Sequence, residues 1–155
     1  MGNSNKYFID GNNLIGKIRD LKQLQKKDGQ LAREKLVFLL DRALVNKKFE
    51  TTVYFDGFQK DAIKSDSLRI IYSDSKPADE LIKLDISNAK NRKKITVVSS
   101  DRSITEFAKV CSCSTVNSEV FSKKLLSERE NSSEKEIELN SSEVDEFKKL
   151  FGVKE

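Results

Sequence analysis

The chain of 155 residues has no histidine, no tryptophan, one proline and two cysteines. The lack of histidine excludes every mechanism that uses a histidine base, nucleophile or metal ligand. Acid–base or metal chemistry must therefore use carboxylates, lysines, hydroxyls or thiols. The two thiols, Cys111 and Cys113, are too few for a zinc site of about four ligands and too close together to link distant parts of a fold. We expect them to be reduced.

Long apolar runs are missing as well. No stretch approaches the roughly 18–20 apolar residues that span a bilayer, and the first residues lack the apolar core of a signal peptide. We therefore expect a cytoplasmic protein with no membrane partner and no small-molecule cofactor. The length suits one compact domain.

Charge is distributed unevenly along the chain. Residues 1–126 contain 24 lysines and arginines against 16 acids, whereas residues 127–155 contain 5 against 9. A basic body is compatible with a polyanionic partner such as RNA, although many lysine-rich faces are only solvated. We predict a domain over residues 1–126, a polar linker rich in Ser, Glu and Asn over 127–142, and a C-terminal amphipathic helix or tail over 143–155.

Short apolar runs that end in turn residues predict strands, and apolar residues at helical spacing predict helices. Strands are expected at 6–9, 51–55, 68–72, 95–99 and, at an edge, 114–116. Helices are expected at 31–45 after an Asp28 cap, after Pro77, from a capping box at Ser103 through Val110, and at 118–129, with a loop or irregular helix at 17–27. The alternation predicts an α/β fold: a three-layer α/β/α sandwich with a mostly parallel sheet of about five strands.

Aspartates follow three of these strands, at Asp10, Asp56 and Asp101. The carboxyl ends of parallel strands share one edge, where open α/β sheets bind ligands. Asp79, with Glu80 beside it, begins the helix after the third strand and should face the same edge. Carboxylates that converge without basic partners have raised pKa values unless a cation neutralises them. One or two Mg²⁺ or Mn²⁺ ions would do so, and would activate water and stabilise a phosphodiester under attack.

Each acid also has a structural interpretation. Asp-Gly pairs are common turns, so Asp10 and Asp56 are also explained as strand ends. Asp101 is explained equally well as a helix cap, and Asp79 as a complement to a helix dipole.

Polar residues flank these acids. Asn12 and Asn13 follow Asp10 and are candidates to bind a metal-bound water or a phosphate, or to adopt turn conformations. Ser99 and Ser100 precede Asp101 and are candidates to orient it or contact phosphate, or to act as plain caps.

Basic residues after the first motif should surround the acidic edge and hold an RNA backbone, unless they are simply solvated. The candidates are Lys17, Arg19 and Lys22, together with Arg102 beside Asp101. The cluster at 90–94 immediately precedes a strand, so we place it at the opposite end of the sheet, where it complements a helix C-terminus. Phe58 is the aromatic residue best placed for base stacking.

Four motifs resemble, in order, those of the NYN-domain family, in particular its YacP-like branch within the PIN-like nuclease superfamily. They are DGNNLIG at 10–16, VYFDG at 53–57, ADELI at 78–82 and VVSSDR at 97–102, and the residues at 143–152 are also similar to tails in that branch. The resemblance implies a PIN-like sheet of about five parallel strands, a divalent metal and endonucleolytic cleavage of RNA. It maps metal ligation onto Asp10, Asp56, Asp79 and Asp101 and a polar supporting role onto Asn13.

The sequence departs from the family pattern in three places. Asn12 replaces a usual aromatic residue, Lys83 stands where an acid is frequent, and the loop at 58–67 is short.

The leading hypothesis is a metal-dependent endoribonuclease. An RNA-binding PIN-like module without catalytic activity is the alternative. A phosphatase with an aspartate nucleophile is a third hypothesis, but it would typically need Asp-x-Asp after the first strand, where this chain has Asp10-Gly11-Asn12.

Overall fold

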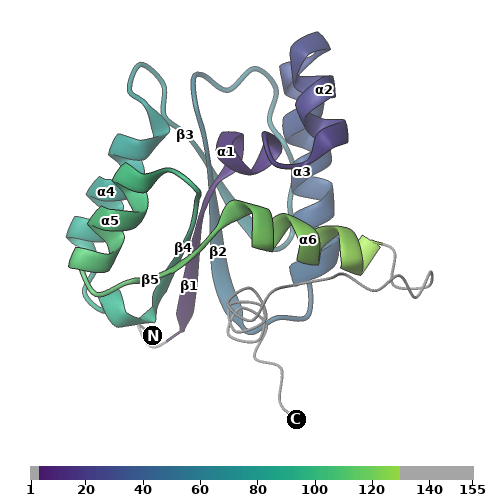
Figure 1. The fold of residues 1–155 in the computed structure, drawn as a ribbon. Coiled ribbons are helices and arrows are strands. Elements are labelled where there is room, and N and C mark those ends of the chain that lie inside the picture. The colour runs from purple at the N-terminus through teal and green to yellow at the C-terminus, as the bar shows by residue number, and fades with distance from the viewer. Residues whose placement is uncertain (1–3, 130–155) are drawn as a thin grey trace.

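The fold is seen in a computed structural model that describes residues 4–129. Its centre is a sheet of five strands: β1 (Asn5–Asp10), β2 (Phe49–Phe55), β3 (Leu68–Tyr72), β4 (Ile95–Val98) and β5 (Ser114–Val116). The strand order is β3-β2-β1-β4-β5, and all four neighbouring pairs are parallel. The predicted α/β class and the five-stranded parallel sheet are confirmed (Figure 1).

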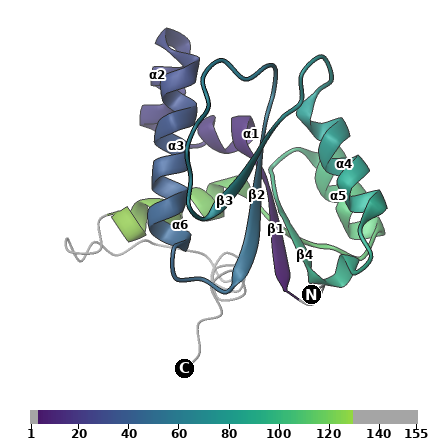
Figure 2. The same cartoon turned by 180° about the vertical axis from the view of Figure 1, so that it is seen from behind.

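Helices cover both faces of the sheet, as the front and back views show (Figures 1 and 2). They are α1 (Gly11–Ile15), α2 (Arg19–Lys27), α3 (Gly29–Leu44), α4 (Ala78–Asn88), α5 (Arg102–Val110) and α6 (Ser118–Arg129), with a 3-10 turn η1 at Arg92–Lys94. Residues of α1, α2, α3 and α6 form one buried apolar cluster with the sheet, and residues of α4 and α5 form the other. The three-layer prediction is therefore confirmed.

Successive apolar side chains along the central strands point to opposite faces of the sheet, so each strand contributes to both buried clusters. Ile9 and Val53 pack toward α3, whereas Phe8 and Tyr54 pack toward α4 and α5. Because both faces are covered, the central strands are apolar almost throughout. Helix α3 contributes the largest helical face, with Leu36 and Leu40 fully buried, and Asp28 caps its N-terminus by accepting from Leu31 N–H at 3.1 Å.

The local secondary structure differs from the expectation from sequence in three places. Residues 11–15 form a short helix, which the turn-like Asp-Gly-Asn-Asn sequence does not predict. Residues 19–27 form a regular helix. The capping box predicted at Ser103 is wrong, because α5 begins at Arg102 and its N-cap is Asp101, one of the alternatives considered for that residue.

Chain order places a switch point beside β1. The chain runs from β1 outward to β2 and β3, then returns to β4 on the other side of β1. The carboxyl ends of β1 and β4 are thus the point where strand order reverses, which is where such sheets bind ligands. We call this end of the sheet the carboxyl edge and the opposite end the amino edge.

The predicted division of the chain at 126 is only partly within the described residues. Helix α6 ends at Arg129 and so includes the first three residues of the predicted linker. The rest of that linker, and the helix or tail predicted at 143–155, lie outside the described residues. Among the helices of residues 4–129, none has the length and apolar character needed to cross a membrane.

Candidate active site

Asp10, the last residue of β1, is the central acid of the carboxyl edge. It is 8% exposed, and its Oδ2 accepts a hydrogen bond from Ser99 Oγ at 3.0 Å. Burial raises the pKa of Asp10 to about 6; the Ser99 bond and the Asn13 backbone N–H lower it, and the nearby charges of Asp56 and Asp101 raise it further. The electrostatic influence of two other acids means that three of the predicted aspartates share this edge. It is an environment that a cation would stabilise.

Asp56 follows β2 and is fixed by contacts from three segments. Its backbone N–H donates to Asn12 Oδ1 at 2.8 Å, and its carbonyl oxygen accepts from Arg33 Nη2 at 2.6 Å. Its side-chain Oδ1 accepts from the Ala78 N–H at 2.7 Å, at the first residue of α4. The carboxylate thus complements the positive end of that helix.

Asp101 caps α5. Its Oδ1 accepts from the N–H groups of Ser103 at 2.8 Å and Ile104 at 3.4 Å, while its own N–H donates to Ser99 Oγ at 3.0 Å. Ser99 therefore links two acids: it donates to Asp10 and accepts from Asp101. In the described part of the chain, the Oδ2 atoms of Asp56 and Asp101 have no hydrogen-bond partner.

Asn13, on α1, ties this helix to the segments that follow β4 and β5. Its Oδ1 accepts from the Ser100 N–H at 2.9 Å and from Ser118 Oγ at 2.7 Å. Ser100 Oγ in turn accepts from the Ser118 N–H at 3.2 Å and donates to Asn117 Oδ1 at 3.3 Å. The predicted polar residues Asn12, Asn13, Ser99 and Ser100 are thus brought together around the acids, where they hold the loops in place.

Asp79 behaves differently from the other three acids. It lies in the first turn of α4, and its Oδ2 is 4.0 Å from Lys83 Nζ, so the expectation that it has no basic partner is wrong. It is not among the groups that shift the pKa of Asp10. Glu80, beside it in the first turn of α4, is exposed.

The predicted RNA-binding cations lie on exposed surface. Arg19 and Lys22 are on α2, which lies near α1 at the carboxyl edge (Figure 1). Lys17 pairs with Glu119 at 3.6 Å, and Arg102 pairs with Glu106 at 3.3 Å. Both pairs are solvent-exposed, and such pairs are weak enough for a phosphate to replace the carboxylate.

Two residues that hold this site were not predicted. Arg33, on α3, binds the carbonyls of Asp56 and Phe58 while its guanidinium lies 5.5 Å and 5.4 Å from the ring centroids of Phe55 and Tyr72. Ser118, at the start of α6, is fully buried against Asn13. Both contacts join segments far apart in sequence, and no local pattern signals them.

The donor set suits a hard divalent cation, since carboxylate, amide and hydroxyl oxygens are its preferred ligands. Within residues 4–129, however, no three acidic or thiol side chains lie close enough to surround one ion. Mg²⁺ often needs fewer protein ligands: one or two carboxylates hold it while water and substrate phosphate complete its shell. The residues therefore fit a magnesium-type ion held by few side chains, and not a closed shell of four aspartates.

Comparison with known proteins identifies a matching domain family and two similar solved structures. Residues 7–151 match the YacP-like NYN domain. A crystal structure of a point mutant of Rae1 (YacP) from Bacillus subtilis superimposes with a TM-score of 0.68 at 20% identity, covering 95% of this chain and 92% of that one. A second crystal structure of Rae1 (YacP) gives a TM-score of 0.65 at 18% identity, covering 93% and 82%. Among curated proteins, no sequence is significantly similar to this chain.

Proposed function

The chain belongs to the YacP-like NYN domain family, and on that premise we propose that it is a divalent-metal-dependent endoribonuclease that acts at the carboxyl edge of its sheet. One observation carries the proposal. Asp10 is buried at the switch point between β1 and β4, and its pKa is raised to about 6 with Asp56 and Asp101 contributing. A buried carboxylate surrounded by like charges has a strong affinity for a cation, and such perturbed groups gather at functional sites.

Asp10 would hold the cation together with one further carboxylate, from Asp56 or Asp101, while water and substrate phosphate complete its shell. Asp79 is the least supported of the four predicted ligands because it pairs with Lys83. When bound, a divalent ion supplies an activated water and stabilises negative charge on a phosphodiester.

The chain's own residues prepare this site. Ser99 holds Asp10 and the backbone of Asp101 at a fixed separation, and Asn13, on the helix that follows Asp10, accepts a hydrogen bond from the Ser100 N–H. These bonds keep the acids in place while they are mutually repulsive, which is the role that supporting hydrogen bonds have around metal ligands. Exposed Arg19, Lys22 and Arg102 are candidates to bind backbone phosphates on either side of the cleaved bond.

RNA cleavage by purified protein tests the proposal. We expect cleavage inside a labelled RNA with Mg²⁺ or Mn²⁺, none with a chelator, and a loss of about a thousandfold or more in Asp10→Asn. Asp66→Asn is the matched control, because Asp66 is an exposed aspartate just before β3, at the amino edge. Equal cleavage by wild type and Asp10→Asn, or cleavage that persists in chelator, would refute the assignment.

A module that binds RNA without cutting it is the second candidate, favoured by the lack of a three-acid cluster in residues 4–129. Mn²⁺ titration separates the two functions. The enzyme binds Mn²⁺ through Asp10, whereas the inactive module would keep its RNA affinity and bind no measurable Mn²⁺.

A further inference from the structure

Phe58 is an aromatic residue whose ring the fold leaves at the surface. It is 63% exposed and belongs to neither buried apolar cluster. The other exposed aromatic residue of the described chain is Phe38, whose ring has the Arg42 guanidinium 5.7 Å from its centroid. Phe58 has no such ring or cation contact within residues 4–129. Single exposed apolar residues are common, so the informative feature is the backbone that carries this one.

Arg33 fixes that backbone at two points. Its guanidinium donates to the Asp56 carbonyl at 2.6 Å and to the Phe58 carbonyl at 3.4 Å. The same group lies beside the rings of Phe55 and Tyr72, which belong to the ends of β2 and β3. Because one planar group makes all these contacts, the backbone of Phe58 is held at a defined place relative to Asp56.

Gly57, between these two residues, is held as well. Its φ of 86° lies in the left-handed region that favours glycine. Its N–H donates to Ser73 Oγ at 3.0 Å, and its carbonyl accepts from the Asp74 N–H at 2.8 Å. Ser73 is buried. The turn of residues 56–58 is therefore hydrogen-bonded along its whole backbone, and it presents an exposed ring.

This turn lies on one side of the central acid of the carboxyl edge. Phe58 is two residues after Asp56, so their Cα atoms are at most about 7 Å apart. Strand β1, which ends at Asp10, lies between β2 and β4. Phe58 therefore follows the strand on one side of Asp10, and Arg102 follows the strand on the other side. An RNA strand that crosses this edge would pass both.

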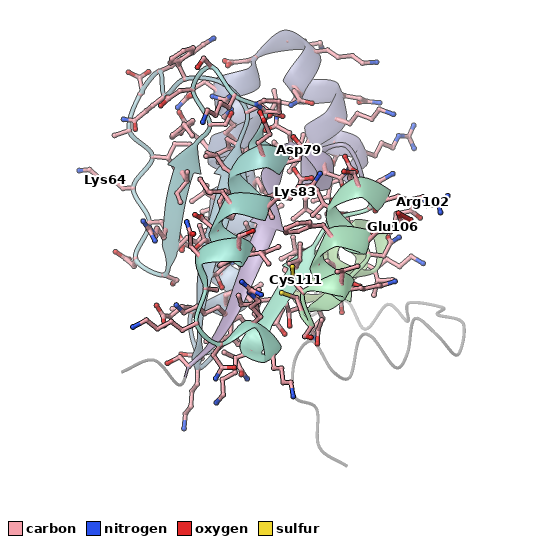
Figure 3. The ribbon with its side chains drawn as sticks, turned by 90° about the vertical axis from the view of Figure 1, so that its left-hand side faces the viewer. Lys64, Asp79, Lys83, Arg102, Glu106 and Cys111 are labelled. Atoms are coloured by element: carbon pink, nitrogen blue, oxygen red, sulfur yellow. The ribbon has the colours of Figure 1, made fainter. Side chains whose placement is uncertain are left out.

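The loop that continues from this turn has no net charge. Residues 57–67 contain two lysines, Lys60 and Lys64, and two acids, Asp61 and Asp66. Figure 3 shows Lys64 extending outward from this loop and Arg102 extending from α5, at opposite sides of the view. Attraction to the phosphate backbone is thus not what this loop offers. An exposed aromatic ring instead offers a face on which any base can stack.

We propose that Phe58 is the residue on which an unpaired RNA base stacks beside the cleaved bond, so that the site selects single-stranded over duplex RNA. This inference rests on the proposed function and adds to it a residue that contacts a base. Bases inside a duplex are already stacked on both faces and have none free for Phe58. Because the turn is held before RNA binds, little conformational freedom is lost on stacking, which favours affinity.

Binding of RNA to the full chain in chelator tests the inference without cleavage. The probe is a single-stranded RNA of about ten nucleotides, within the range of known single-strand sites, with 2-aminopurine in place of one base. Anisotropy of a terminal dye measures affinity, and quenching of the 2-aminopurine emission measures stacking. We expect Phe58→Leu to weaken binding by about five- to hundredfold and to reduce the quenching. Phe58→Trp should restore both.

Three controls separate stacking from other roles of this residue. Phe38→Leu makes the same change at the other exposed aromatic and should bind within about twofold of wild type. Duplex RNA should bind equally to wild type and Phe58→Leu. The slope of log affinity against log salt concentration should also be the same in both, because no phosphate contact is lost. Urea unfolding should show equal stabilities, since the ring lies outside both buried clusters.

The outcomes distinguish this inference from the proposed function. Equal affinity of wild type and Phe58→Leu for the single strand, an equal loss on duplex RNA, or a lower salt slope in Phe58→Leu each overturns the role of Phe58 and leaves metal-dependent cleavage intact. If Phe58→Leu loses affinity for the single strand alone, but the wild type cuts no RNA with Mg²⁺ or Mn²⁺, stacking is supported and the proposed enzyme activity is overturned.

Discussion

Acids held by hydrogen bonds lie at the carboxyl edge of the sheet, whereas several lysines lie around a cavity at the amino edge. Asp10 is buried and bonded to Ser99, and Asp101 accepts two backbone N–H groups. The amino-edge cavity, about 630 Å³, has Lys93 and Lys109 in its wall. Both edges are densely charged, and the acids of the carboxyl edge are buried or bonded to backbone N–H groups.

The basic cluster before β4 shows what the amino edge does with its charge. Arg92 donates to the carbonyls of Ile86 at 3.1 Å and Ser87 at 2.7 Å, in the last turns of α4. The Ile86 carbonyl also accepts from the Ala89 N–H at 3.2 Å, and a cation at this end complements the helix dipole. The structural interpretation of residues 90–94 is therefore confirmed for Arg92. Density of charge alone does not identify a site, because a charge such as that of Arg92 can serve to complete the end of a helix.

The largest effect we predict concerns the close packing behind Asp10. A Cβ on Gly11 would lie 2.6 Å from Phe55 Cε1 and 2.8 Å from the carbonyl oxygen of Tyr54, so Gly11→Ala must displace α1 or β2. We expect a loss of about 3 kcal/mol in the free energy of unfolding, the upper range for overpacking. Gly29→Ala, where a Cβ has no atom within 4 Å, should be neutral or slightly stabilising. Urea unfolding measures both, and equal stabilities would show that the edge is not packed tightly.

The second prediction uses the pKa of Asp10. Because the folded state raises this pKa to about 6 from 3.8, ionisation of Asp10 disfavours folding, and its contribution to stability is lost as pH rises from about 4 to about 6. Asp10→Asn cannot ionise. Without divalent cations, it should be more stable than wild type at pH 8 by at most about 3 kcal/mol, and equal to it near pH 4.

Urea unfolding in chelator at several pH values checks this difference. Asp66→Asn is the control and should follow the wild type at every pH. Added Mg²⁺ should stabilise the wild type at pH 8 and leave Asp10→Asn unchanged. A difference in the free energy of unfolding between wild type and Asp10→Asn that does not vary with pH would mean that ionisation of Asp10 does not destabilise the fold.

The third prediction concerns the serine between two acids. Ser99→Ala removes the hydrogen bond to Asp10 and the acceptor for the Asp101 N–H. Loss of such a supporting group typically lowers metal affinity or activity by about 10–100-fold, and we expect this range for RNA cleavage with Mg²⁺. Ser114→Ala, at the amino-edge cavity, should stay within about twofold of wild type. If both variants cleave RNA equally, the network does not support catalysis.

Sequence alone predicts much of this arrangement, because strands and helices follow from patterns of apolar residues that are close together in the chain. Each apolar run becomes a strand because both sheet faces are covered, and β3 has the predicted bounds 68–72. The aspartates at the ends of three of these runs, Asp10, Asp56 and Asp101, then reach the carboxyl edge as a consequence of parallel pairing.

Contacts between distant segments were not predictable. Arg33 reaches Asp56 from α3, Ser118 reaches Asn13 across 105 positions, and Lys83 reaches Ser103 on the next helix. Each depends on how helices pack over the sheet, which no local pattern encodes. This is why the family resemblance maps metal ligation onto all four aspartates, whereas the structure gives Asp79 alone among them a lysine partner within the described residues.

The smallest predicted effect compares single cations at the two edges. Arg102 is 89% exposed beside Asp101, and its pairing with Glu106 is too weak to prevent contact with a phosphate. Arg102→Ala should weaken binding of a short RNA by a few-fold and lower the slope of log affinity against log salt concentration by about one, as expected for one lost phosphate contact. Lys93→Ala, an exposed cation at the amino edge, should change neither quantity. Fluorescence anisotropy at several salt concentrations, in chelator to prevent cleavage, measures both. An equal loss in the two variants would mean that RNA crosses from one edge of the sheet to the other, and that the lysines of the amino-edge cavity belong to the binding surface.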